Sequence, residues 1–243
     1  MTVLTMALIG FLAGFVLDAL IARLAREPYE RGELEEDDLR LKKDGGASLE
    51  LHSESGALAM PRALTTASAY RKAAVVAITT LLFALLGAQY AGDSLHLAIV
   101  AFYASVLIIC TATDALAYRV PNSVTYPAII GALIIGMTID GASRGDVAFG
   151  GLLGGGLLFV PALLTGGAMG MGDVKLAFFV GFALGLAYVV PALLVMAISG
   201  GAVSAFLLVT RLRSKGDPIP YAPFIAGAAM IVMLMGGTAF RAV

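Results

Sequence analysis

Apolar residues gather in eight stretches of the chain that are separated by short polar segments. A helix that crosses a bilayer needs about 20 mostly apolar residues. The stretches predict spans at about 3–24, 71–91, 95–113, 123–140, 147–165, 174–188, 190–210 and 221–240. The boundary between the sixth and seventh is weakly marked, because Tyr188 to Pro191 is hardly polar. The pattern predicts an all-α polytopic membrane protein, a bundle of about eight transmembrane helices.

The composition supports the same fold class. Of the 243 residues, 59% are hydrophobic and 14% are charged, whereas soluble domains carry about 45–50% apolar and about 25% charged residues. A water-soluble domain could not bury this much apolar surface, so we expect the lipid bilayer as the surroundings. The formal net charge of −1 gives no case for a nucleic-acid partner. A single cysteine, Cys110, excludes an intrachain disulfide and a cysteine-cluster zinc site.

The basic residues predict the orientation in the membrane, because cytoplasmic segments are enriched in Lys and Arg. With the N-terminus outside, 14 of the 16 basic residues fall on the cytoplasmic side, and only Arg144 and Arg241 fall outside. No basic residue precedes the apolar run from Val3 to Ala22, and we therefore expect a retained first span rather than a signal peptide. The bias also favours an even number of spans.

The residues between the first two predicted spans, 25–70, form the one sizeable polar segment. It contains the acidic run from Glu35 to Asp38, and Gly45-Gly46 and Ser53 to Gly56 are typical of turns. Ser48 to His52 predicts a short strand. The segment is too small for a confident independent fold, and we expect a cytoplasmic loop at the membrane surface.

Many of the 29 glycines lie inside predicted spans. Gly150, Gly151, Gly154, Gly155 and Gly156 gather in the fifth span, and Gly181 with Gly185 forms a GxxxG pair in the sixth. Small residues at this spacing let helix backbones approach closely in a membrane. We interpret these glycines as helix-packing positions.

Three polar motifs fall on the predicted cytoplasmic side. The first is Asp114-Ala-Leu-Ala-Tyr-Arg-Val-Pro-Asn122, after the third span. The second is Gly170-Met-Gly-Asp-Val-Lys175, before the sixth. The third is Pro218-Ile-Pro-Tyr-Ala-Pro-Phe224, before the last span.

Asp114 and Asp173 are the candidates for chemistry. An ionisable side chain near the hydrocarbon boundary is costly, which favours a functional role. Two close carboxyl groups do not both ionise easily, so a pair supplies a base to activate water and an acid to polarise a carbonyl. Beside Asp173, Gly170 and Gly172 leave room for a peptide backbone and permit positive φ angles in a tight turn.

Simpler roles remain open for the same residues. Asp173 is placed to be a helix N-cap, and Asp114 at a span end could be merely solvated. Arg119 and Lys175 are typical positive-inside anchors, although Lys175 could also steady a carboxylate or the peptide. Pro223 is typical of a helix start.

Asp18 lies within the first predicted span, where an acid is costly. We expect it to face the bundle or its cytoplasmic rim. A structural hydrogen bond and a functional role are equally compatible with this position.

The motifs together resemble those of the type IV prepilin peptidases, which are intramembrane aspartyl proteases of the GxGD class. Asp114 followed by Val120-Pro-Asn122 is similar to the first aspartate motif of the family. The segment from Gly166 to Leu176 is similar to the second, and Ile219 to Ile225 resembles the Pro-rich segment before the last span. The likeness covers most of residues 71–243 and, less closely, 1–26.

The resemblance implies a division of the chain into a first span (1–24), a cytoplasmic loop without a Cys cluster (25–70) and an aspartyl peptidase membrane domain (71–243). It implies an enzyme of the inner membrane that removes the short basic leader of prepilins or pseudopilins at the cytoplasmic face. Cleavage in this family typically follows a glycine, just before the apolar helix. Asp114 and Asp173 match the two catalytic positions. The residues expected to bind substrate or shape the site are Gly170, Gly172, Lys175, Arg119, Pro121, Asn122, Pro220 and Pro223.

The chain departs from the family in one respect and leaves a second question open. Bacterial members often carry two zinc-associated CxxC pairs after the first span, but residues 25–70 contain no cysteine. We therefore expect no metal site and no cofactor for proteolysis. Many bacterial members also methylate the new N-terminus with S-adenosylmethionine, and no motif in this sequence decides whether this chain does so.

Two alternative functions use the same acids. A presenilin-like GxGD protease typically has Tyr before the first Asp, whereas Thr113 stands here. An ion-coupled transporter could also use intramembrane carboxylates. Transporters often show paired repeats, and the Gly-Met-Gly-Asp motif occurs once.

Overall fold

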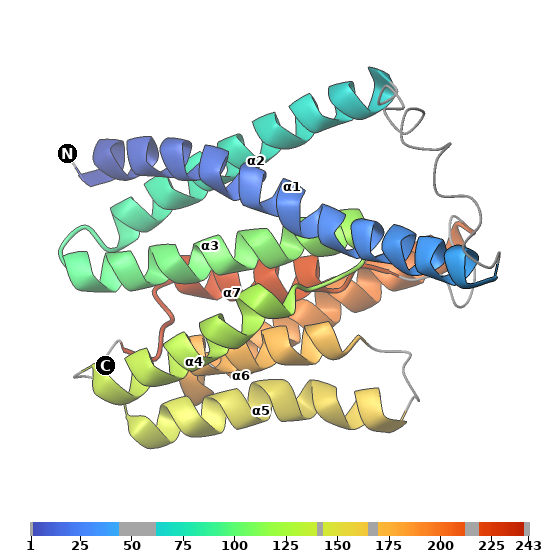
Figure 1. The fold of residues 1–243 in the computed structure, drawn as a ribbon. Coiled ribbons are helices and arrows are strands. Elements are labelled where there is room, and N and C mark those ends of the chain that lie inside the picture. The colour runs from blue at the N-terminus through green and yellow to red at the C-terminus, as the bar shows by residue number, and fades with distance from the viewer. Residues whose placement is uncertain (1, 44–61, 140–142, 165–169, 212–218, 241–243) are drawn as a thin grey trace.

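The computed structural model describes residues 2–43, 62–139, 143–164, 170–211 and 219–240. The side chains of 26–43 and 62–68 lie outside this description. The helices are α1 (Thr2–Lys43), α2 (Arg62–Gln89), α3 (Ser94–Ala117), α4 (Asn122–Thr138), α5 (Arg144–Leu164), α6 (Met171–Val209) and α7 (Ala222–Leu234). Figure 1 shows them as one bundle, and no strand occurs in the described residues.

The helical lengths and compositions confirm the predicted class, an all-α polytopic membrane protein. Within the described residues, five helices are long and apolar enough to cross a bilayer, namely those at Thr2–Ala25, Ala69–Gln89, Ser94–Ala117, Arg144–Leu164 and Met171–Val209. The helices α4 and α7 are apolar but shorter, at 17 and 13 residues. The predicted count of eight spans is not confirmed, and two elements explain the difference.

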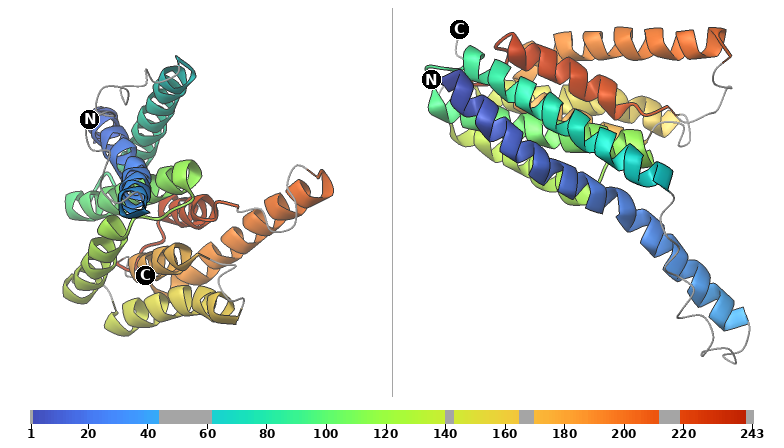
Figure 2. Two further views of the ribbon diagram at one scale, coloured as in Figure 1. Left: turned by 45° about the vertical axis from the view of Figure 1, so that its right-hand side comes forward. Right: turned by 90° about the horizontal axis from the view of Figure 1, so that it is seen from above.

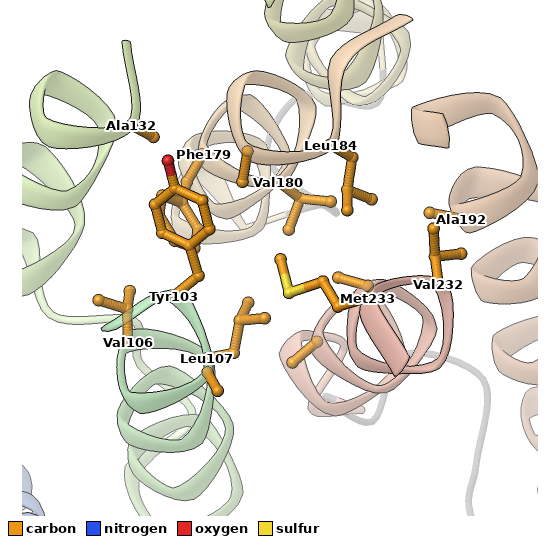
Figure 3. Close-up of a cluster of buried hydrophobic side chains, with 14 of the residues drawn as sticks. Tyr103, Val106, Leu107, Ala132, Phe179, Val180, Leu184, Ala192, Val232 and Met233 are labelled. Atoms are coloured by element: carbon orange, nitrogen blue, oxygen red, sulfur yellow. The ribbon is translucent and has the colours of Figure 1, made fainter. Parts of the chain in front are cut away.

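The first difference is α6, which contains the predicted spans 174–188 and 190–210 as two arms. The chain reverses at Gly185, where φ is 73° and ψ is 173°. Ala177 and Met196 line one small cavity, although a straight helix would place them about 28 Å apart. Figure 3 shows Leu184 and Ala192 on separate helical segments. The boundary is a glycine hinge, earlier than the predicted position near Tyr188.

The second difference is the last predicted span, 221–240, because α7 ends at Leu234. The N–H of Gly237 donates to the carbonyl of Val232 at 2.9 Å, and Gly236 has a φ of 85°. This is the Schellman arrangement that terminates helices. The chain then folds back, and the N–H of Ala239 donates to the carbonyl of Ala183.

The predicted polar loop, 25–70, is also more helical than expected. The helix α1 continues to Lys43, and α2 begins at Arg62. Figures 1 and 2 show α1 extending past the end of the bundle. The expected strand from Ser48 to His52 and the expected turns lie outside the described residues.

Asp18 joins α1 to α2. Its Oδ1 accepts a hydrogen bond from Nε of Arg71 at 2.8 Å, and its Oδ2 faces a second guanidinium nitrogen at 3.4 Å. Asp18 is buried, with 7% of the residue exposed. Of the two roles left open from the sequence, the structure shows the structural one, an ion pair between α1 and α2.

The glycines of α5 pack as the GxxxG interpretation predicts, with one exception. A Cβ on Gly154 would lie 2.7 Å from the carbonyl oxygen of Ala177, and one on Gly150 would lie 2.7 Å from that of Gly181. Both neighbours are on the first arm of α6, so the two backbones are in contact. Gly156 has open space around it and plays no such part.

The core forms where α3, α4, both arms of α6 and α7 meet. Figure 3 shows Tyr103 of α3 beside Phe179 and Val180, with Met233 of α7 close by. At one end of the bundle, the hydroxyl of Tyr90 donates to the carbonyl of Met233 at 2.7 Å. This packing fixes α3, α6 and α7 side by side, and their other ends carry the polar motifs.

Candidate active site

Asp114 lies near the end of α3 and is 6% exposed. The backbone N–H of Ala222 donates to its Oδ2 at 3.1 Å, and the backbone of Tyr221 supplies a further hydrogen bond. The helix ends just beyond, where Tyr118 adopts a left-handed conformation and its N–H donates to the carbonyl of Asp114. The alternative that Asp114 is merely solvated is therefore wrong, and the Pro-rich motif holds this acid through its backbone.

Asp173 is the third residue of α6 and lies at the positive end of the helix dipole. The N-cap is Gly170, whose carbonyl accepts from the N–H of Asp173 at 3.1 Å. The interpretation of Asp173 as the N-cap is therefore wrong, because Asp173 lies in the first turn of the helix, three residues after the N-cap. Its Oδ1 is buried and has no hydrogen-bond partner in the structure as described. Such an orphaned oxygen leaves an acceptor available for water or a substrate.

The two acids come from opposite helix ends that meet at one end of the bundle. Figure 1 shows the end of α3 and the start of α6 on the same side, and the carboxyl groups of Asp114 and Asp173 interact electrostatically. They are 59 positions apart in sequence, so tertiary packing alone brings them together.

Tyr221 was not singled out from the sequence, although it lies in the Pro-rich motif between Pro220 and Pro223. Its hydroxyl lies within the electrostatic range of Asp173, and its backbone bonds Asp114. The ring packs beside Gly200, where a Cβ would lie 2.9 Å from the hydroxyl. Its place between two prolines at a helix start was the available signal.

The glycines beside Asp173 serve close packing rather than an unusual backbone conformation. Gly170 has a φ of −66°, and Gly172 is inside α6, so the expectation of positive φ angles is wrong. A Cβ on Gly172 would lie 2.8 Å from Cβ of Val120 in the first motif. The missing side chain thus allows the two aspartate motifs to touch.

Lys175 and Asn122 link the same two motifs. Nζ of Lys175 donates to Oδ1 of Asn122 at 2.8 Å and lies 4.6 Å from the ring centroid of Tyr126. No carboxylate among the described residues forms an ion pair with this ammonium. The structure does not show the suggested contact with a carboxylate and shows a clamp between α4 and α6 instead.

The remaining predicted residues lie around this site. Arg119 is exposed in the link between α3 and α4, and Pro121 is the N-cap of α4. Pro220 is half-buried before α7, and Pro223 is the second residue of that helix, as its interpretation as a helix start predicts. Within the described ranges, no three His, Cys, Asp or Glu side chains gather in a way that could hold a metal ion.

The arrangement matches a known family. Residues 101–205, which include both acids, match the model of the type IV leader peptidase family. The match supports the resemblance predicted from the motifs for this part of the chain, and the Pro-rich motif lies just beyond the matched segment.

Two proteins with known names are similar to this chain. A prepilin leader peptidase/N-methyltransferase of Bacillus subtilis (strain 168) is 33% identical over 166 residues, which are 65% of this chain and 64% of the relative. A protein of the same name from Aeromonas hydrophila is 30% identical over 141 residues, covering 56% of this chain and 49% of the relative. The chain thus spans between about half and two thirds of these relatives. No solved structure matches.

Proposed function

We propose that this protein is an intramembrane aspartic endopeptidase that removes the short basic leader of type IV prepilins or pseudopilins. The observation that carries the proposal is the meeting of Asp114 and Asp173 at one end of the bundle, inside the segment that matches the family. The names of the relatives support the same reaction. The positive-inside bias supports a site on the cytoplasmic side, and the resemblance implies the inner membrane.

The chemistry follows from two neighbouring carboxyl groups that share one proton. The ionised carboxylate takes a proton from water as the water oxygen attacks the scissile carbonyl carbon. The protonated partner donates a hydrogen bond to the carbonyl oxygen. Collapse of the tetrahedral intermediate breaks the C–N bond, and the amine leaves with a proton from the pair. The products are a leader with a new carboxylate and a mature chain with a new amino terminus.

The surroundings of the two acids support this role. Asp114 is fixed by backbone donors of the Pro-rich motif, so its carboxyl group is oriented before substrate binds. Preorganised groups lower the reorganisation that the transition state requires. The unpartnered Oδ1 of Asp173 is placed to accept a hydrogen bond from the attacking water.

The product of the reaction distinguishes this proposal from its alternatives. The full chain, reconstituted in liposomes with a prepilin-type substrate, is expected to cut just before the apolar helix, after a glycine, as mass spectrometry of both products would show. A cut deep within the apolar helix would favour the presenilin-like reading. Solute or ion flux without proteolysis would favour a transporter.

The same reaction tests methylation of the new N-terminus. The relatives' names include N-methyltransferase activity, and S-adenosylmethionine is the methyl donor that the resemblance implies. Adding S-adenosylmethionine and measuring whether the mature product gains the mass of one methyl group decides whether this chain has the second activity.

A further inference from the structure

An open groove of 750 Å³ runs along α1 and α2, away from the predicted catalytic acids. Phe11 and Phe15 of α1 form one wall. Ala73, Ala77 and Ala84 of α2 form part of its floor. The small alanine side chains leave a hollow beside the two rings, and nothing in the described structure fills it.

The groove faces the surroundings of the bundle. Apolar side chains that border or neighbour it are strongly exposed, with Leu12 at 58%, Ile78 at 52% and Leu81 at 60%. In a membrane protein such side chains contact lipid. Occupation of the groove by apolar chains would therefore be favourable.

The dimensions of the groove fit an acyl chain better than a helix. Its lining runs along α2 from Ala69 to Ala84, which is about 22 Å at 1.5 Å per residue. The 750 Å³ volume spread over that length gives a mean cross-section of about 34 Å². A helix about 10 Å wide has a cross-section of about 80 Å². One leaflet of the hydrocarbon core is about 15 Å thick. The groove is longer than this, so it has room for the length of one acyl chain.

One end of the groove carries a positive charge. Nζ of Lys72 lies 5.0 Å from the ring centroid of Phe15, and both residues line the groove. The neighbouring Arg71 is neutralised by Asp18 at 2.8 Å. No carboxylate in the described part of the chain pairs with Lys72, so its ammonium is available to an anion.

We propose that this groove binds an anionic phospholipid, with the phosphate beside Lys72 and one acyl chain along the alanines of α2. The groove supplies both halves of the recognition, a long apolar trough and a single cation at one end. A zwitterionic lipid fills the same trough but is attracted less strongly by the ammonium of Lys72, because its head group has no net charge. This site is separate from the acids and does not depend on the proposed peptidase activity.

The test is a lipid competition on the purified full chain. Phosphatidylglycerol and phosphatidylcholine with identical acyl chains are offered in mixed micelles, and native mass spectrometry measures the ratio of bound lipids. Lys72→Gln is expected to lower the preference for phosphatidylglycerol about fivefold, the effect of one basic residue near an anionic surface. Lys72→Arg is expected to keep the preference.

Two further variants separate the groove from general surface charge. Ala77→Leu fills the trough and is expected to lower retention of both lipids, whereas Arg211→Gln removes an exposed cation elsewhere and is expected to change neither. Equal effects of Lys72→Gln and Arg211→Gln, or full retention in Ala77→Leu, would overturn the proposal. A dimer that Ala77→Leu dissociates would also overturn it, because a second copy would then occupy the groove. Circular dichroism confirms that each variant is folded.

Discussion

At the scale of single residues, the site is held together by contacts between its three motifs. Asp114 is bonded by the backbone of Ala222, Gly172 packs on Val120, and Lys175 bonds Asn122. Each contact joins segments that are far apart in sequence. The residue types could be nominated from the sequence, because carboxylates and glycines at a span end are unusual. Their partners could not, because a side-chain contact depends on the tertiary fold.

The Lys175–Asn122 clamp leads to a prediction about rate. Lys175→Gln and Asn122→Ala are each expected to lower kcat for leader removal about tenfold, a loss of about 1.4 kcal/mol, with little change in KM. The reason is that the clamp sets the spacing of the two aspartate motifs and does not touch the substrate. Steady-state kinetics on reconstituted protein measure both constants.

The controls for the clamp are a double variant and a distant one. The double variant is expected to be no slower than either single one, because both remove the same bond. Arg144→Gln, at the other end of the bundle, is expected to leave the rate unchanged. Fully additive losses in the double variant would show that the two residues act separately.

The absence of cysteine from residues 25–70 leads to a prediction about metal dependence. The one cysteine, Cys110, is buried in α3 at 0% exposure. Metal chelators are therefore expected to leave leader removal unchanged, as rates before and after EDTA treatment would show. Inhibition that zinc alone reverses would contradict this expectation.

At the scale of helices, hydrophobicity located most of the elements but not their ends. The first five predicted spans overlap α1 to α5. The predicted boundary near Tyr188 lies too late, because the turn at Gly185 between the arms of α6 is apolar and gives no polar signal. The positive φ of Gly185 could not be recognised from the composition of a chain with 29 glycines. The same limit hid the early end of α7, because Gly236 and Gly237 stop the helix inside an apolar run.

The hinge of α6 gives a stability prediction. Gly185→Ala places a Cβ at a φ of 73° and against Oδ2 of Asp146. With a ψ of 173° this backbone conformation is essentially restricted to glycine and costs another residue about 1–3 kcal/mol, so the melting temperature in detergent is expected to fall. Gly201→Ala, in the second arm with open space around it, is expected to be neutral or stabilising. Equal melting temperatures for the two variants would contradict the reversal at Gly185.

At the scale of the whole molecule, the bundle separates two ends. The polar motifs meet at one end. At the other, His96 contacts Thr238 at 2.8 Å, and the hydroxyl of Tyr90 bonds the backbone of Met233. The charge bias predicts that the end with the acids faces the cytoplasm, because 14 of the 16 basic residues lie on that side of the predicted topology.

Thiol labelling tests this orientation. Arg119→Cys and Asp93→Cys place a cysteine at the two ends, and the native Cys110 is fully buried and expected to be silent. A membrane-impermeant thiol reagent is expected to label Asp93→Cys in intact cells and Arg119→Cys only in inverted membrane vesicles. The opposite pattern would invert the proposed topology.

The pairing of the two acids is the central claim, and the rate of leader removal tests it most directly. Asp114→Asn, Asp173→Asn and the double variant are compared with the unchanged protein in liposomes, after circular dichroism shows that each is folded. Because the acids act as one unit, each single variant is expected to abolish cleavage as completely as the double variant. Leader removal that persists in either folded single variant would contradict the account.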